Sequence, residues 1–263
     1  MKKNIALVLS SGGARGMAHI GIIEELEKHG YKISSIAGSS MGAMVGGIYA
    51  AGQLPVLKKW LCSLDKKQVF DLVDFTFSSK GLIKGDRIMK KLKKMIPDQN
   101  IEDLKIPFCA VATDIVNGKE IVFNSGSLYD AIRASISIPT FFVPFINNGK
   151  QLVDGGVVNP IPINRVKRKR NDILVISNVN ANIQHEKILP VSNPDYFGYF
   201  KLIKKSISLM INQISILTIE KYPPDILINV SRDSHETFVF YKAAEIIKVG
   251  EQAARKVLNN DKS

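Results

Sequence analysis

The 263-residue sequence predicts an α/β domain with a mostly parallel central sheet. A short apolar run, a glycine-containing turn and a helical stretch follow one another twice within the first fifty residues, as in βαβ units. Hydrophobic residues make up 45% of the chain, which is enough to bury a substantial core. No linker, repeat or low-complexity tract interrupts the sequence. We therefore expect one domain over residues 1–263, with its core motifs within 5–160 and residues 161–259 in the same unit.

Each element is expected from a local signal: apolar runs beside turn residues for strands, and an apolar stripe at helical spacing for helices. The expected strands are residues 4–9, 34–37, 107–114, 121–123, 141–144, 151–153, 173–177 and 225–230. The expected helices are residues 17–29, 43–51, 56–64, 86–96, 127–135, 196–219 and 241–258. Residues 70–82, rich in Phe, Ser and Gly, are expected to be irregular.

The charge and the cysteines restrict the class of partner. The formal net charge is +12, which suits an anionic lipid surface or nucleic acid, and equally a lysine-rich surface that only faces water. The basic run at residues 165–170 lacks the interleaved aromatics of a stacking platform, so we interpret it as a solvated helix end and expect no nucleic-acid partner. Cys62 and Cys109 lie far apart, which predicts two buried, reduced thiols and no metal site.

The N-terminus resembles the start of a secretory signal, but its apolar run is too short. Residues 5–9 are apolar, whereas the core of a signal peptide needs about 7–15 such residues. No stretch reaches the roughly 18 apolar residues of a membrane-spanning helix. We therefore expect a mature cytoplasmic protein, at most peripheral to the inner face of the membrane.

The sequence Gly38-Ser39-Ser40-Met41-Gly42 fits the nucleophile-elbow pattern G-x-S-x-G. Such a turn lifts the serine hydroxyl out of the sheet, and side chains at the glycine positions would collide with the strand and the helix. The helix N-terminus that follows can stabilise an anion near Ser40. A strand-like run before the turn and a helix-like run after it favour this interpretation over an ordinary turn.

A second glycine-rich turn contains Gly12, Gly13, Arg15 and Gly16 after the first strand. Its backbone N–H groups could converge on a phosphate or form an oxyanion hole, where one donor is worth roughly 3 kcal/mol. The phosphate fingerprints do not match, because no Gly-Lys-Ser/Thr follows and Ser11 replaces the first glycine of G-x-G-x-x-G. A nucleotide or anion site is therefore the weaker of the two interpretations.

Asp154, followed by Gly155 and Gly156, ends a short strand, and on its own would be an ordinary turn residue. Histidine is the usual base for a serine nucleophile, and the chain has four. His29 is expected at the surface and His19 in packing beside the glycine-rich turn, whereas His185 and His235 lie in polar loops. One of the latter two could complete a Ser-His-Asp triad in an esterase or thioesterase, although neither follows a strand-end motif.

The three motifs in this order resemble those of the patatin-like phospholipases. The resemblance covers most of the chain from Ile5 onward, and further matching segments are Ala18–Gly21, Lys80–Ile83, Arg133–Ser135 and Ile138-Pro139. Ser11 in place of a glycine is the visible departure. The resemblance implies a three-layer α/β/α fold and a lipid ester as substrate.

The same resemblance implies a serine–aspartate dyad in place of a triad, with Ser40 as nucleophile and Asp154 as general base. The oxyanion hole would be formed by the N–H groups of Gly12, Gly13 and Met41. Arg15 would either steady the loop or attract an anionic headgroup. No cofactor and no metal are implied.

Two sets of residues near these motifs suggest contact with lipid. Phe70, Phe75, Phe77 and the run Phe141–Phe145 could line an acyl channel, although core packing explains most of them equally well. Lysines gather between residues 58 and 94, and helices with apolar faces and lysine flanks can lie on an anionic bilayer. A solvated lysine-rich face is the alternative for this second set.

Overall fold

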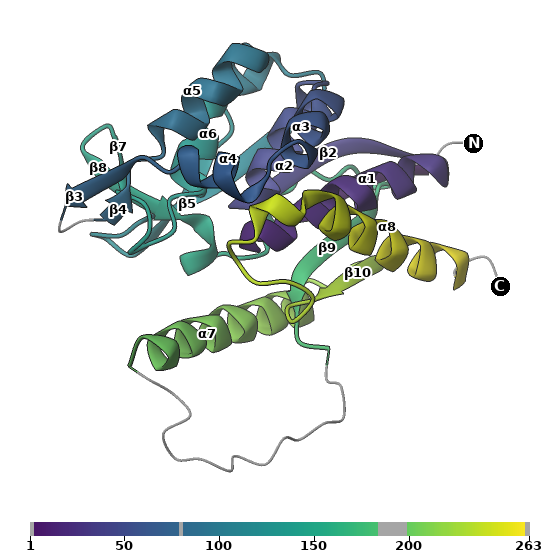
Figure 1. Cartoon of the computed structure of the whole chain (residues 1–263). Coiled ribbons are helices and arrows are strands. Elements are labelled where there is room, and N and C mark those ends of the chain that lie inside the picture. Colours follow the sequence, from purple (N-terminus) through teal and green to yellow (C-terminus); the bar gives the residue numbers. More distant parts are fainter. Residues whose placement is uncertain (1–2, 79–80, 184–198, 261–263) are drawn as a thin grey trace.

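A computed structural model describes residues 3–78, 81–183 and 199–260. Its centre is an eight-stranded sheet with the strand order β10-β9-β1-β2-β5-β8-β7, in which β6 also pairs with β5 (Figure 1). The strands are β1 (Lys3–Leu9), β2 (Tyr31–Ser39), β5 (Phe108–Asp114), β6 (Lys119–Phe123), β7 (Phe145–Asn147), β8 (Lys150–Asp154), β9 (Ile173–Ala181) and β10 (Ile226–Ser231). The pairs from β10 to β5 are parallel, and β6, β7 and β8 are antiparallel to their neighbours. The predicted α/β class is confirmed.

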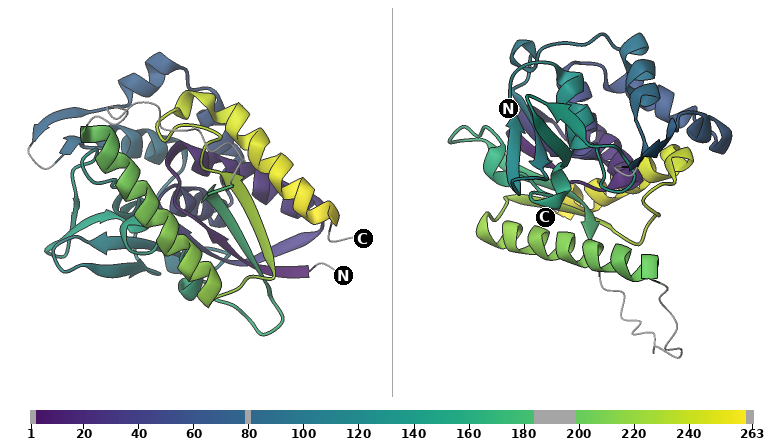
Figure 2. Two further views of the ribbon diagram at one scale, coloured as in Figure 1. Left: turned by 90° about the horizontal axis from the view of Figure 1, so that it is seen from below. Right: turned by 90° about the vertical axis from the view of Figure 1, so that its left-hand side faces the viewer.

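Helices cover both faces of this sheet. They are α1 (Ala18–Lys28), α2 (Met41–Ala50), α3 (Leu54–Cys62), α4 (Lys66–Asp71), α5 (Asp86–Met95), α6 (Leu128–Ser135), α7 (Tyr199–Lys221) and α8 (Ala243–Asn260). Short 3-10 turns include Gly13–Met17 and Gly155–Val157. Figure 2 shows α7 alone on one side of the sheet, with α1 and α8 on the other.

The alternation of side chains along β1 explains the three layers. Ile5, Leu7 and Leu9 are fully buried in the large core shared with α1, α2 and α8. Val8 points to the opposite face, into a smaller cluster with Ile161 and Ile163, and Ile219 of α7 packs against this cluster. Because consecutive residues of a strand face opposite sides, a continuous apolar run is what a doubly covered strand requires.

Two strands meet end to end along one side of β5, and this meeting positions the candidate site. Along β5, Val111 pairs with Ser39 of β2, and the next residue, Ala112, pairs with Asp154 of β8. The other side of β5 is paired with β6 from Ala110 to Asp114, alongside both of these contacts. Since β2 and β8 run in opposite directions, their last residues face each other across one step of β5.

The structure corrects the prediction for residues 70–82. This segment contains the end of α4 and a two-stranded hairpin of β3 (Phe75–Ser78) and β4 (Gly81–Ile83). Asp74 stabilises the base of the hairpin, because its carboxylate accepts backbone N–H groups from Gly85, Asp86 and Arg87. The alternation of Phe75, Thr76 and Phe77 was the strand signal.

Three further predictions were wrong. Residues 141–144 form no strand: a turn covers residues 139–141, the N–H groups of Phe141 and Phe142 both donate to Ile138 O, and β7 starts at Phe145. The basic run at 165–170 is no helix end, because only a 3-10 turn at Ile163–Arg165 enters it. Cys62 is exposed at the end of α3, whereas Cys109 is buried as expected. The long helix begins at Tyr199; residues 196–198 lie outside the described residues.

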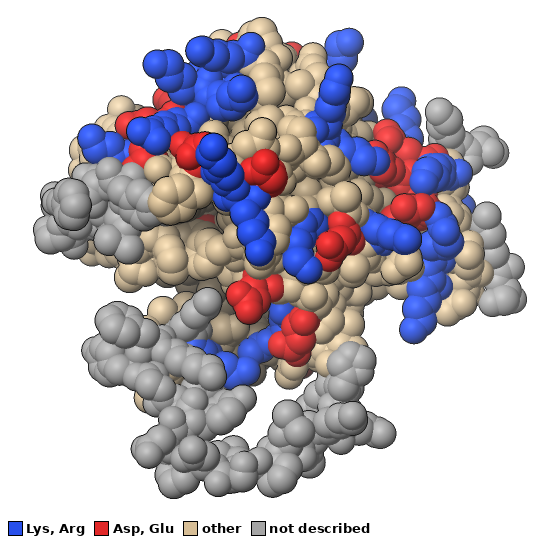
Figure 3. All heavy atoms as spheres, in the orientation of Figure 1, with Lys and Arg blue, Asp and Glu red and all other residues tan. Residues whose placement is uncertain are grey.

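Lysine and arginine side chains gather over α5, at the upper left of Figure 3. Lys90, Lys91, Lys93 and Lys94 are exposed there, while Met89 and Leu92 on the same helix are buried. The apolar face of α5 is thus already covered by the protein. In the part of the chain that the structure describes, no helix is long and apolar enough to cross a membrane.

Candidate active site

Ser40 lies in a strained turn between β2 and α2. Its backbone has φ 55° and ψ −123°, which a residue with a side chain seldom adopts. Both flanking glycines are required, since a Cβ on Gly38 would lie 2.5 Å from Gly42 O, and one on Gly42 would lie 2.3 Å from Leu9 O. The Ser40 N–H donates to Ser135 Oγ over 2.8 Å. The turn therefore has the geometry expected of a nucleophile elbow.

Asp154 at the end of β8 accepts a hydrogen bond from the Ser40 hydroxyl, through Oδ2. Its other oxygen accepts the Gly156 N–H over 2.7 Å. Both Ser40 and Asp154 are almost fully buried. Burial raises the pKa of Asp154 to about 6, although the bonds from Ser40 and Gly156 act in the opposite direction. A carboxylate with such a pKa can exchange protons near neutral pH.

The glycine-rich loop adjoins both residues. A Cβ on Gly16 would lie 2.3 Å from Met41 Cγ, and one on Gly156 would lie 2.9 Å from Ser11 Oγ. The loop is thus packed between the first turn of α2 and the turn after Asp154. Within the described residues, the N–H groups of Gly12 and Gly13 have no backbone acceptor.

Arg15 ties this loop to neighbouring elements. Its Nε and Nη2 donate to Asn180 Oδ1 over 3.1 and 2.6 Å, and its Nη1 donates to His235 O over 2.8 Å. Asn180 in turn donates to Ser11 O over 3.0 Å. Burial lowers the pKa of Arg15 to about 10. Of the two roles considered for Arg15, these contacts support steadying the loop.

The histidines do not reach the Ser40 hydroxyl in the described part of the chain, where its partner is Asp154. His19 is buried, bonds to Ser177 Oγ and Ser10 O, and has its pKa lowered to about 4 by burial, so its predicted packing role is confirmed. His29 is half-buried, not at the open surface, and bonds to Glu25 O. His235 lies 3.6 Å from Glu245. His185 lies outside the described residues.

Sequence reasoning missed several residues that hold the site. Ser135 Oγ accepts the Ser40 N–H and donates to Val111 O over 2.7 Å, bridging the elbow to β5. The Asp154 N–H donates to Ser137 O, and Thr113 Oγ1 donates to Asp154 O. Ser135 lies in a matching segment, but nothing in its local pattern shows that it reaches a turn 95 residues earlier.

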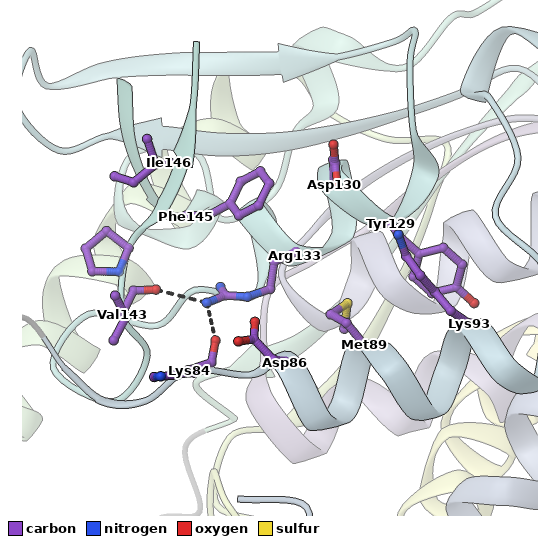
Figure 4. A pocket seen from close by; sticks show the side chains of 11 residues that line it. Lys84, Asp86, Met89, Lys93, Tyr129, Asp130, Arg133, Val143, Phe145 and Ile146 are labelled. Atoms are coloured by element: carbon purple, nitrogen blue, oxygen red, sulfur yellow. Dashed lines mark hydrogen bonds between the residues drawn. The ribbon is translucent and has the colours of Figure 1, made fainter. Parts of the chain in front are cut away.

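A separate cavity of about 530 Å³ lies on the other side of α6 (Figure 4). Arg133 points into it and donates to Lys84 O, Val143 O and Ser137 Oγ, so three of its five N–H donors are used by the protein. Val143, Pro144 and Phe145 line this cavity, but Ser40 and Asp154 do not. In the described residues, no group of three or more His, Cys, Asp or Glu side chains could hold a metal ion.

The fold and the turn at Ser40 place this chain among α/β proteins with a strained strand-to-helix turn at a serine. The chain belongs to the patatin-like phospholipase family, whose sequence model matches residues 7–166.

Named relatives agree with this assignment. Uncharacterized NTE family proteins of Mycobacterium tuberculosis and Mycobacterium bovis are 42% identical over 178 residues, which is 68% of this chain and 49% of theirs. The chain thus spans about half the length of these relatives. Patatin-like phospholipase domain-containing protein 6 of Mus musculus is 30% identical over 76% of this chain and 15% of its own length.

Among solved structures, the crystal structure of VipD from Legionella pneumophila has a similar fold. The TM-score is 0.52 at 15% sequence identity, covering 98% of this chain and 67% of VipD. The three-layer α/β/α architecture expected from the family resemblance is confirmed.

Proposed function

We propose that this protein is a serine acyl-hydrolase that cleaves carboxylic esters of lipids, with Ser40 as nucleophile and Asp154 as its general base. The observation that carries the proposal is the hydrogen bond from Ser40 Oγ to a buried carboxylate whose pKa is raised to about 6. A base works best when its pKa lies near the working pH. Ionised Asp154 would be ready to accept the serine proton at pH 7.

The reaction would proceed in two halves. Ser40 Oγ attacks the ester carbonyl carbon while its proton passes to Asp154 Oδ2, and the leaving alcohol then takes that proton. Water attacks the acyl-enzyme, gives its proton to Asp154, and the proton returns to Ser40 as the fatty acid leaves. The N–H groups of Gly12, Gly13 and Met41 would stabilise the oxyanion in both halves. The proposed substrate class includes phospholipids and lysophospholipids. The proposal also includes peripheral contact of the protein with an anionic membrane.

Covalent labelling with a fluorophosphonate probe tests the nucleophile. We expect wild type to label and Ser40→Ala to remain unlabelled. Ser39→Ala is the matched control, because Ser39 is the preceding residue, is fully buried, and its hydroxyl has no partner among the described residues. Labelling of Ser40→Ala, or loss of labelling in a folded Ser39→Ala, would contradict the assignment of Ser40.

The same experiment addresses the base. Asp154→Asn should label far more slowly than wild type, and His235→Ala should label at the wild-type rate. The reverse result would favour a triad esterase that uses a histidine. A wild type that resists the probe even with a lipid surface supplied would favour an anion-binding module with no hydrolase activity.

A further inference from the structure

Helix α7 presents an apolar face to solvent. Seven of its large apolar side chains are exposed, several by half their surface or more: Leu202, Ile203, Ile207, Leu209, Met210, Ile216 and Leu217. Single exposed apolar residues are common, but a contiguous set on one helix marks an interaction surface.

The helical spacing separates this exposed face from the face that packs on the sheet. Ile211, Ser215 and Ile219 repeat every four residues and are buried or half-buried, with Ile219 against the core cluster beneath the sheet. The exposed set occupies the opposite side. The outer side also carries exposed Ser206, Gln213 and Glu220 among the apolar side chains, so it is suited to an environment that offers both apolar and polar groups.

The position of α7 connects this outer face to the proposed site. Ile226, at the start of β10, pairs with Val175 near the start of β9, so the chain that leaves the end of β9 must return through α7. The first turns of α7 therefore lie toward the carboxyl ends of the strands, where Ser40 lies, as Figures 1 and 2 show. A groove of about 360 Å³ has Ile214 and Leu217 of α7 on one wall, and Val158 and Asn159, just after the Asp154 turn, on another.

Charge complementarity indicates what covers the outer face. The first seven residues of α7 contain Lys201, Lys204 and Lys205, and the only acid of the helix is Glu220, in a chain of net charge +12. A second copy would bring like charges together, whereas anionic lipid headgroups would attract them. Helices with apolar side chains and flanking lysines lie in the interface of bilayers.

We propose that the outer face of α7 docks on the surface of an anionic phospholipid bilayer. Docking would hold the strand-end edge, which is the edge of the sheet where β2 ends beside Ser40 and β8 ends at Asp154, against the bilayer. The docking itself does not depend on the proposed lipid hydrolysis. Only the purpose of docking rests on it, which is to bring the site to a substrate in that bilayer. The proposal also identifies the docking element as α7, since the lysines of α5 offer charge without exposed apolar side chains.

Vesicle flotation tests the proposal. The full chain is mixed with phosphatidylcholine vesicles or with vesicles that also contain phosphatidylglycerol, and the bound fraction is measured. We expect binding to the phosphatidylglycerol vesicles, reduced by added salt, and at least a tenfold weaker affinity for Leu202→Ser/Leu209→Ser/Met210→Ser. Phe70→Ser is the matched control, because Phe70 is 64% exposed on α4, in the lysine-rich region between residues 58 and 94.

Four outcomes would overturn the proposal. Wild type does not bind the anionic vesicles, or the triple variant binds as wild type does. Alternatively, Phe70→Ser loses binding while the triple variant retains it, which assigns docking to the lysine-rich region. A dimer in sedimentation velocity that the triple variant dissolves would assign the face to a second copy.

Two measurements separate this proposal from the proposed function. Binding is also measured with Ser40→Ala, which should dock normally although it cannot hydrolyse esters. Hydrolysis of a short, water-soluble p-nitrophenyl ester should be unchanged within about twofold in the triple variant, because α7 lies outside the catalytic residues. Docking without any ester hydrolysis would leave the α7 assignment intact and refute the hydrolase.

Discussion

The strand-end edge buries polar side chains, whereas helix α7 exposes apolar side chains. At the edge, Ser40, Asp154 and Ser135 are polar groups that the protein buries and connects by hydrogen bonds. Along α7, apolar side chains such as Leu209 and Met210 stay exposed, by 50% and 57%. Burying a carboxylate costs free energy, and a set of apolar side chains left in water forgoes the stabilisation that burial would give, so each arrangement points to a use beyond folding.

The difference separates two kinds of functional surface. A reactive site needs groups held at fixed positions, so substitutions there should change rates strongly. A docking face needs apolar area and charge without fixed geometry, so substitutions there should leave the free protein almost unaffected.

The largest effect should come from the proposed base. Asp154→Asn keeps the size and most hydrogen bonds of the side chain but cannot accept the serine proton. We expect kcat/KM on a soluble ester to fall by about a thousandfold or more, as when the acid of a triad is replaced. His235→Ala should stay within about twofold. A modest loss in Asp154→Asn would show that another group acts as base.

The same substitution should stabilise the protein. The pKa of Asp154 rises from 3.8 to about 6 on folding, so its ionised form opposes folding by about 3 kcal/mol above pH 6, and this penalty fades as the pH falls toward 4. Asp154→Asn should therefore raise the free energy of unfolding by up to that amount at pH 8. Urea denaturation at pH 8 and pH 4 would measure it.

Asp114→Asn supplies the control of opposite sign. Hydrogen bonds from Asn117 hold the pKa of Asp114 below its usual range, so its ionised form supports folding and its loss should destabilise the protein at neutral pH. An equal change in the free energy of unfolding in the two variants would mean that ionised Asp154 does not oppose folding.

The pH profile of the wild type should report the same carboxylate. Because the base must be ionised, kcat/KM should be constant above the pKa of about 6 and fall about tenfold per pH unit below it. Between pH 7 and pH 4 the loss should be roughly a hundredfold, measured on a soluble ester whose own chemistry does not titrate. A profile that stays flat down to pH 4 would exclude Asp154 as a base with a raised pKa.

A smaller effect is expected at Ser135, which positions the elbow without touching substrate. Ser135→Ala leaves the Ser40 N–H without its acceptor, so we expect kcat to fall about tenfold with KM little changed, and the unfolding free energy to drop by about 1–3 kcal/mol. Ser39→Ala removes a buried hydroxyl that has no partner in the described structure, and should cause neither loss. If both variants behaved alike, the bridge from Ser135 to the turn would have no role in catalysis.

The active-site turn and α7 differ in how much of each could be predicted from the sequence. The spacing of Gly38 and Gly42 around Ser40 predicted a strained turn, because that geometry is local. Asp154 was a candidate only through the family resemblance, since its meeting with Ser40 depends on β2 and β8 sharing one side of β5. Such a long-range pairing leaves no local pattern.

For α7, the apolar sequence predicted the helix but not its surroundings. Helical spacing shows which residues share a face, and nothing in it shows whether a face is covered by the rest of the chain. The exposure of α7 therefore had to come from the three-dimensional structure.

The smallest effect is expected on α7 itself. Leu209→Ala should change the unfolding free energy of the free protein by less than about 0.5 kcal/mol, whereas Leu26→Ala, at a fully buried leucine of α1, should cost about 2–5 kcal/mol. Both values come from urea denaturation without lipid. If Leu209→Ala proved as costly as Leu26→Ala, the outer face of α7 would already be covered in solution. A second copy of the chain would then replace the bilayer as the partner of this face, because a bilayer cannot stabilise the protein in a measurement made without lipid.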